Sequence, residues 1–284
     1  MKSEDMFKGV AGVNIATRFW SPEGTARGIV ILVHGFKSHS GYFKWPAEQF
    51  ASNGFAVYAL DHQGRGKSEG ERFFIDKFSN WVDDVNTLTG LARSQNPGLP
   101  VFVLGHSVGG VIASTYTFEH QQDVAGLICE SWAYDVGLPN LVQLAFEGIG
   151  KLVPHLPLYS LKNEIFSRDP AVVEQMNSDP LINTEKEPAE TASEVLKAAA
   201  RIKENMPNLR VPVFIIHGTD DKATRWQGSQ YFYDNVGSTY KTLKLYEGGY
   251  HDLLNDIDKE TVMADISDWI DARIPATRTK SVAG

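Results

Sequence analysis

Ser107, Asp221 and His251, in that chain order, are residue types that together could perform nucleophilic catalysis. A serine hydroxyl is a weak nucleophile until a base removes its proton and a carboxylate orients that base. Ser107 is the centre of the sequence GHSVG at residues 105–109, which follows the apolar run 101–104. A strand, a glycine-bounded turn and a helix would present this hydroxyl at the edge of a sheet, as a nucleophile elbow does.

The candidate acid and base follow two later apolar runs. The acid comes after residues 211–216, and loops that leave the C-terminal ends of parallel strands commonly hold functional residues. Two aspartates compete there, and we favour Asp221 because Asp220 suits a turn or a helix start. The candidate base, His251, follows a strand-like run at 240–246 and a glycine-rich turn.

An oxyanion hole needs two preorganised N–H groups. One is expected from the amide of Val108, immediately after the nucleophile. The other is expected from the amide of Phe36, on the loop after the apolar run 29–33. His106, beside the nucleophile, is expected either to support the turn or to contact substrate.

At this point the chain resembles the α/β-hydrolase superfamily, and within it the monoacylglycerol lipase and lysophospholipase group. The matching pieces cover most of the chain: HGFKSHSGYF from His34, LDHQGRGKSEG from Leu60, GHSVGG from Gly105, FSRDPAVVEQMNSDPLI from Phe166, HGTDD from His217 and YEGGYH from Tyr246. In that family the acid occupies the position of Asp221. The resemblance implies an α/β-hydrolase fold, with a mostly parallel central sheet flanked by helices and an inserted helical lid.

The sequence departs from the family pattern around the substrate. Lys37, Ser38 and Tyr42 replace the glycine, glutamate and arginine that the family commonly has after its oxyanion strand. Met176 replaces a frequent tyrosine, and Leu254 stands where a second histidine can follow the base. These changes weaken potential hydrogen bonds to a hydroxylated leaving group. An ester of a less polar alcohol, or an ester with another headgroup, is therefore an alternative substrate. We expect Ser38, Tyr42, Met176 and Leu254 to contact substrate.

An insertion interrupts the predicted core. The segment between the strands predicted at 124–129 and 211–216 is far longer than an ordinary crossover, which predicts a lid at 133–190. The core would then comprise residues 1–132 and 191–275. Within its second part we expect helices from about Thr191 to Glu204 and from about Asp256 to Ile270.

The first part of the predicted lid is rich in apolar residues, including Phe146 and Ile149. Such side chains either pack the lid onto the core, or line an acyl pocket or rest on a membrane surface. Prolines and charged residues interrupt this stretch, which excludes a transmembrane span. We expect Phe146 and Ile149 to lie near the substrate. We also expect that any peripheral contact with a membrane is made through the lid.

Composition agrees with one enzyme-sized domain. A chain of 284 residues with 42% hydrophobic content can bury one large core plus a small lid. The net charge of −8 argues against a nucleic-acid partner. A single cysteine, Cys129, and a polar first segment suggest a cytoplasmic protein, and residues 276–284 suggest a disordered tail. Because no HExxH, GxxxxGK[ST] or GxGxxG pattern occurs, we expect neither a catalytic metal nor a cofactor.

These features favour a serine carboxylic-ester hydrolase that acts on monoacylglycerol-like lipids or other small apolar esters through an acyl-enzyme. The same triad would also serve a thioesterase, an amidase or a C–C bond hydrolase, since a fold and a triad do not specify the scissile bond. A ligand-binding receptor that retains the fold without turnover is the alternative from another class. The serine at the elbow disfavours an aspartate-nucleophile enzyme.

Overall fold

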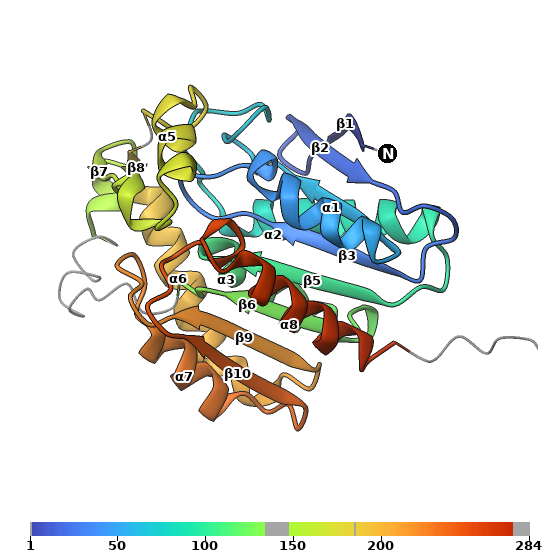
Figure 1. Ribbon diagram of the computed structural model, residues 1–284. Helices are drawn as coiled ribbons and strands as arrows, with labels where there is room; N and C mark the ends of the chain where they lie inside the picture. The colour runs from blue at the N-terminus through green and yellow to red at the C-terminus, as the bar shows by residue number, and fades with distance from the viewer. Residues whose placement is uncertain (1, 134–147, 185, 275–284) are drawn as a thin grey trace, which may run out of the picture.

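An eight-stranded sheet forms the centre of the molecule, and the computed structural model describes residues 2–133, 148–184 and 186–274 (Figure 1). The spatial order of the strands is β1-β2-β4-β3-β5-β6-β9-β10. The β1–β2 and β2–β4 pairs are antiparallel, and all later pairs are parallel. The strands are β1 (Lys2–Lys8), β2 (Asn14–Trp20), β3 (Gly28–Val33), β4 (Phe55–Leu60), β5 (Val101–His106), β6 (Gly126–Glu130), β9 (Val213–Gly218) and β10 (Lys241–Tyr246).

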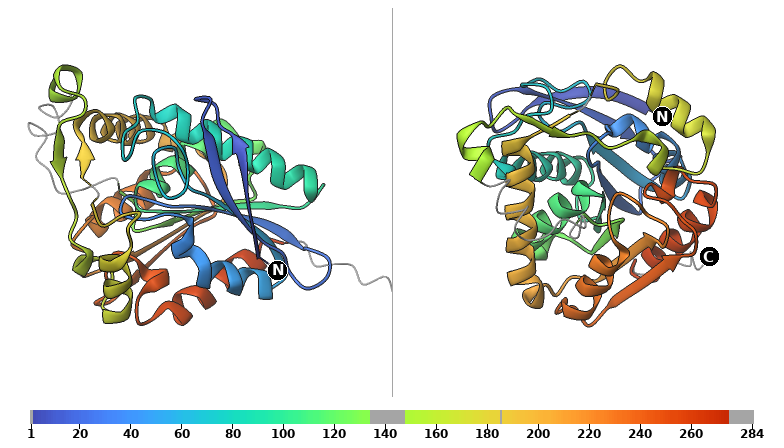
Figure 2. Two further views of the ribbon diagram at one scale, coloured as in Figure 1. Left: turned by 90° about the horizontal axis from the view of Figure 1, so that it is seen from above. Right: turned by 90° about the vertical axis from the view of Figure 1, so that its left-hand side faces the viewer.

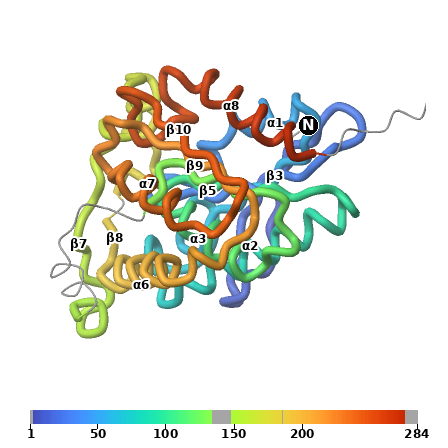
Figure 3. Tube along the Cα trace, turned by 90° about the horizontal axis from the view of Figure 1, so that it is seen from below, coloured from blue at the N-terminus to red at the C-terminus, as the bar shows by residue number. Residues whose placement is uncertain are grey.

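Helices cover both faces of the sheet (Figure 3). The helices of the described residues are α1 (Lys44–Ser52), α2 (Phe78–Gln95), α3 (Val108–Glu119), α5 (Pro170–Ser178), α6 (Ala189–Asn205), α7 (Trp226–Asn235) and α8 (Lys259–Asp271), of which all but α5 pack on the sheet. Helices α1 and α8 pack on one face, and α2, α3, α6 and α7 pack on the other, which gives two hydrophobic clusters separated by the sheet. Every residue of β3, β4, β5, β6 and β9 is buried, as parallel strands covered on both faces require. This arrangement confirms the predicted α/β architecture.

Short elements complete the connections. The 3-10 helices are η1 (Ser40–Phe43), η2 (Gln121–Asp123), η3 (Asn163–Ile165), η4 (Met206–Asn208) and η5 (Leu253–Asn255). A separate two-stranded antiparallel sheet pairs β7 (Pro157–Tyr159) with β8 (Glu187–Pro188).

Residues 148–184 and 186–188, which we call the cap, lie at one end of the large sheet (Figure 2). Two contacts place the cap over the loop that follows β3. The Lys37 ammonium donates to the carbonyl oxygen of Ile182 at 3.2 Å, and His39 Nε2 lies 2.9 Å from the Asp179 carboxylate. The cap therefore covers the C-terminal edge of the parallel strands, where the candidate triad is expected. The predicted boundaries of core and lid stay a prediction.

Two parts of the sequence-based prediction lie outside the described residues. Phe146 belongs to the segment 134–147, and the predicted disordered tail belongs to the segment 275–284.

Candidate active site

Ser107 lies at a sharp turn between the last residue of β5 and the first residue of α3. Its backbone angles are φ 57° and ψ −122°, a conformation that residues other than glycine rarely adopt and that stores strain. The surrounding backbone holds this conformation: the Ser107 N–H donates to the Glu130 carbonyl oxygen at 2.9 Å, and the Ala133 N–H donates to the Ser107 carbonyl oxygen at 3.3 Å. A local strand-turn-helix sequence thus produces the strained turn of a nucleophile elbow.

Two glycines allow the neighbouring backbones to approach this turn. A Cβ atom at Gly109 would lie 2.1 Å from the carbonyl oxygen of Val33. At Gly35 it would lie 2.8 Å from the Ser107 Cβ and 3.2 Å from the Val108 nitrogen. Real Cβ atoms do not come so close to other heavy atoms, so the loop after β3 can pack directly on the elbow only because these residues are glycines.

Asp221 and His251 meet on loops that follow β9 and β10. Asp221 Oδ2 lies 2.8 Å from His251 Nδ1, and both side chains are fully buried. Asp220 is exposed, and its backbone N–H donates to the Gly249 carbonyl oxygen. The other ring nitrogen of His251, Nε2, is buried and has no hydrogen-bond partner among the described residues. The structure thus pairs His251 with Asp221 rather than Asp220 and leaves Nε2 available to exchange a proton.

The Asp221 carboxylate has two further partners that the sequence analysis did not assign. His217 Nε2 lies 2.9 Å from Asp221 Oδ2, and the Thr224 hydroxyl donates to the same oxygen at 2.8 Å. Burial alone would raise the pKa of Asp221, but the charges and hydrogen bonds of His251 and His217 hold it well below its ordinary value. The acid is therefore ionised at neutral pH. The signal for His217 was present, since it begins the HGTDD segment and lies four residues before the acid.

The two expected oxyanion donors lie on adjoining segments. Val108 is the first residue of α3, so its N–H has no acceptor within the helix and lies at the positive end of the helix dipole. Phe36 follows Gly35, whose Cα lies against both Ser107 and the Val108 nitrogen. Both residues thus lie on backbone that adjoins the nucleophile, and their role as oxyanion donors stays a prediction.

His106 points away from solvent and contacts the base. Its Nε2 donates to the His251 carbonyl oxygen at 3.2 Å, and burial lowers the pKa of His106 to about 3, so the ring is neutral. Potential ligand atoms of His106, Glu130 and Asp252 lie within 4.8 Å of one another, and these are residue types that bind metals. Burial raises the pKa of Glu130 well above its ordinary value and that of Asp252 to about 6. Glu130 Oε1 accepts a hydrogen bond from the Leu254 N–H at 3.0 Å.

The residues expected to contact substrate are distributed over two places. Ser38, Tyr42 and Met176 are all buried. Tyr42, on the core, packs in one cluster with Met176 of the cap, and its hydroxyl donates to the Asp179 carboxylate at 3.2 Å. Leu254 is not brought together with them, since its side chain is fully buried in the hydrophobic cluster beneath α1 and α8.

Ile149, also expected near the substrate, is partly buried in a helical stretch at 148–152. Two of the predicted substrate residues, Tyr42 and Met176, are therefore engaged in the contact between the core and the cap.

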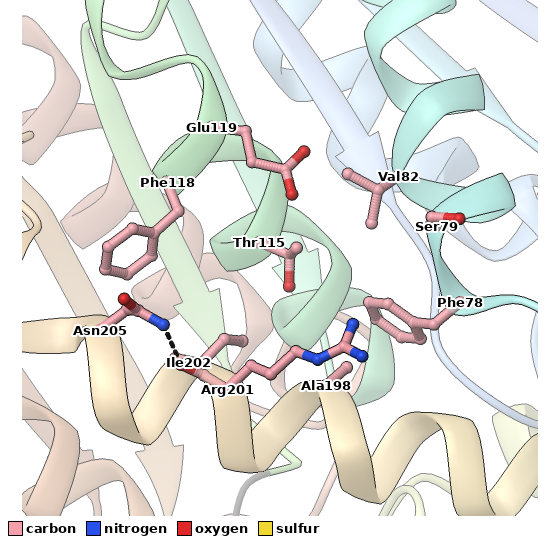
Figure 4. Close-up of a pocket in the computed structure, with 10 residues that line it drawn as sticks. All are labelled: Phe78, Ser79, Val82, Thr115, Phe118, Glu119, Ala198, Arg201, Ile202 and Asn205. Carbon is pink, nitrogen blue, oxygen red and sulfur yellow. Dashed lines mark hydrogen bonds between the residues drawn. The ribbon is translucent and has the colours of Figure 1, made fainter.

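A groove between α2, α3 and α6 lies outside this site (Figure 4). It has a volume of about 330 Å³, and its lining includes Phe78, Phe118 and Ile202, with Glu119 and Arg201 among the polar residues. None of the three triad candidates lines it. The groove is therefore not a candidate for ester hydrolysis.

Cys129 has no role in this site. Its side chain is fully buried, and burial raises the pKa of its thiol to about 12. Because the thiolate is the reactive form, this cysteine is an inert packing residue at neutral pH.

A parallel sheet that presents a strained serine after β5, with an acid and a base on two later loops, defines the α/β-hydrolase class of serine enzymes. Comparison with known proteins places the chain more narrowly. The family model described as "Serine aminopeptidase, S33" matches residues 24–258, and the chain belongs to this family.

Several of its relatives are lipases that it matches over nearly their whole length. The chain is 35% identical over 272 residues to a monoacylglycerol lipase of Mycolicibacterium smegmatis, covering 95% of this chain and 97% of that protein. It is 32% identical to the human monoglyceride lipase, covering 95% and 91%. The crystal structure of a Paleococcus ferrophilus monoacylglycerol lipase superimposes with a TM-score of 0.82 at 26% identity, covering 92% of this chain and 99% of that one. The protein is a serine ester hydrolase.

Proposed function

We propose that the enzyme hydrolyses monoacylglycerol-like lipids, with Ser107, Asp221 and His251 as its catalytic triad. The observation that carries this assignment is the 2.8 Å contact between Asp221 Oδ2 and His251 Nδ1, which leaves His251 Nε2 without a partner. An ionised Asp221 requires a proton on Nδ1, so Nε2 carries the lone pair that can accept the serine proton.

The proposed reaction has two half-reactions. His251 Nε2 removes the Ser107 proton as the oxygen attacks the ester carbonyl, and the N–H groups of Phe36 and Val108 bind the oxyanion. His251 then gives that proton to the departing alcohol, which leaves the acyl group on Ser107. A water molecule activated by His251 attacks the acyl-enzyme, and the fatty acid is released.

The choice of a monoacyl lipid rests on the relatives and on the cap. Proteins named monoacylglycerol or monoglyceride lipase match this chain almost from end to end. The cap contributes apolar surface beside the site, because Phe166 lies edge-on to the His251 ring at 5.1 Å and packs with Met176 and Ile182. An apolar wall next to the base suits an acyl chain better than a charged substrate.

Substrate preference tests the proposal. We expect kcat/KM to be higher for monoacylglycerols than for methyl esters, thioesters and amides of the same acyl chain, measured as initial rates under the same detergent conditions. Preference for the thioester or the amide would show that the scissile bond is assigned wrongly. Preference for the methyl ester would show that the glycerol group is not recognised.

We also propose that the cap is the part of the enzyme that meets a lipid surface. Leu152, Val153 and Leu156 are 83%, 49% and 45% exposed, and they lie close together in the sequence beside Lys151. No helix in the described ranges is long and apolar enough to cross a membrane. Contact through this apolar group would place the enzyme on the surface of a membrane rather than across it.

Vesicle binding tests this contact. Changing Leu152 and Val153 together to Ser should weaken partitioning onto phosphatidylcholine vesicles by about tenfold or more, because each buried aliphatic side chain contributes about 1.5–3 kcal/mol. Hydrolysis of a water-soluble short-chain ester should be unchanged. Tyr240→Ser is the control, because Tyr240 is 67% exposed, between the values for Leu152 and Val153, but precedes β10, at the end of the parallel strands away from the cap. Equal binding by the cap variant and this control would contradict the proposal.

A further inference from the structure

We propose that Arg65 is a positioning residue for ester hydrolysis: paired with Glu187 of the cap, it holds the Phe36 ring and thereby orients the Phe36 N–H toward the oxyanion. This inference rests on the proposed function, in which that N–H is one of the two oxyanion donors. Neither Arg65 nor Glu187 touches the triad through any contact described above.

Arg65 and Glu187 form a buried, two-pronged ion pair. Arg65 Nη2 donates to Glu187 Oε2 at 2.8 Å and Nη1 donates to Oε1 at 3.2 Å, and the side chains are 1% and 2% exposed. The pair joins the loop after β4 to strand β8 of the cap, across 122 positions of the sequence. A buried pair of this kind seldom stabilises a fold more than apolar residues of the same size would. Its value must therefore lie in the geometry that it imposes.

The guanidinium of Arg65 lies on aromatic rings. Its central carbon is 4.3 Å from the centre of the Phe36 ring and 5.5 Å from that of Trp81. Phe36 also meets Trp81 edge-on, with ring centres 6.3 Å apart, and is itself buried. Nη2 approaches the carbonyl oxygen of Phe73 at 3.4 Å as well. The Phe36 ring thus packs against both the flat Arg65 cation and the Trp81 indole.

The Phe36 backbone has little room to adjust independently of its ring. The preceding residue, Gly35, packs on Ser107 and on the Val108 nitrogen, as its contact distances show. The following residue, Lys37, has a left-handed φ of 53° and donates through its ammonium to Ile182 of the cap. Since the cap holds both Lys37 and, through Arg65, the Phe36 ring, it fixes the peptide plane that carries the N–H donor.

Replacing the ion pair with apolar side chains tests this arrangement. The double variant Arg65→Met/Glu187→Met should fold with nearly the wild-type melting temperature, because it removes both buried charges together. Its kcat should fall about tenfold, a part of the 10²–10³ that loss of a whole oxyanion donor costs. KM should change little, because a donor aimed at the oxyanion acts in the transition state more than in the ground state.

A second set of variants tests the route through the ring. Phe36→Leu keeps the backbone N–H and removes the ring, so it should lower kcat to a similar extent. Adding the double methionine change to Phe36→Leu should then have little further effect, because the two changes interrupt the same contact. Affinity for a trifluoromethyl ketone, which forms an oxyanion on the serine, should fall in parallel with kcat. Arg65→Lys, which keeps the charge but loses the flat stacking surface, should also lower kcat.

Arg72→Met is the matched control. Arg72 also ties the core to the cap, donating to the Leu181 carbonyl oxygen at 2.8 Å. It donates to the Gly66 carbonyl oxygen at 3.0 Å and lies over the Phe73 ring as well, so Arg72→Met disturbs the same turn and the same part of the cap. It should leave kcat unchanged, which separates the positioning of Phe36 from general attachment of the cap.

The inference would be overturned if the folded double variant had the wild-type kcat. If the double variant does not fold, a wild-type kcat in both Arg65→Lys and Phe36→Leu would overturn it instead. Full additivity in the combined variant would overturn the route through the ring. Neither result would affect the proposed function, which the activity of the Ser107→Ala enzyme and the substrate comparison test separately.

Discussion

Ser107→Ala should abolish ester hydrolysis, lowering kcat by a factor on the order of 10⁶, while the protein folds normally. Loss of the nucleophile of a serine triad has an effect of this size because the remaining acid and base cannot form an acyl-enzyme. The measurement is the rate on a chromogenic ester, together with labelling by a fluorophosphonate probe, which reacts only with an activated serine. Most of the wild-type rate persisting in the variant would mean that another group attacks the ester.

A companion variant shows whether the elbow is strained as its angles suggest. Ser107→Gly should be equally inactive but should unfold at a higher temperature than Ser107→Ala, because glycine adopts φ 57° and ψ −122° without strain. The strain relieved is about 1–3 kcal/mol, which exceeds the roughly 0.4–1 kcal/mol that glycine costs through the unfolded chain. A lower melting temperature for Ser107→Gly than for Ser107→Ala would show that the turn stores no strain, because the cost of glycine in the unfolded chain would then be left without compensation.

The parts of the site that the sequence predicted are those that local sequence determines. The elbow is a continuous strand-turn-helix segment, so its glycines and apolar runs place Ser107 directly. The first helix predicted after the lid is also determined locally: it is expected at residues 191–204, and α6 spans Ala189–Asn205. The last helix begins later than expected, at Lys259 rather than Asp256, because the Asp256 carboxylate accepts hydrogen bonds from the Arg168 backbone and side chain.

The parts that the sequence did not predict depend on contacts between distant segments. Arg65 sits in a glycine-rich turn that reads as a simple connection, and its partner Glu187 is 122 residues away in the cap. Nothing in either local sequence specifies that pairing. Leu254 shows the same limit, since the family pattern suggested a place beside the substrate. In the structure, the Leu254 side chain instead packs in the core, and its N–H donates to the Glu130 carboxyl group.

Asp221→Asn is the second change with a very large expected effect. An amide in place of the carboxylate removes the charge that stabilises the imidazolium and can hold His251 in the wrong tautomer, so kcat should fall about 10⁴-fold. The fluorophosphonate probe should label Ser107 far more slowly in this variant, although the serine itself is intact. The three contacts on Asp221 Oδ2, from His251, His217 and Thr224, make this oxygen the point at which the change acts.

Asp220→Asn provides the matched control for this variant. It makes the same chemical change one residue earlier, on an exposed side chain, while the backbone contact of that residue with Gly249 is retained. Its kcat should stay close to the wild-type value, because a solvated charge at the surface interacts only weakly with the site. If Asp220→Asn were the inactive variant and Asp221→Asn the active one, the acid would be assigned to the wrong residue. Comparable losses in both would instead indicate that the loop after β9, rather than one carboxylate, determines the orientation of His251.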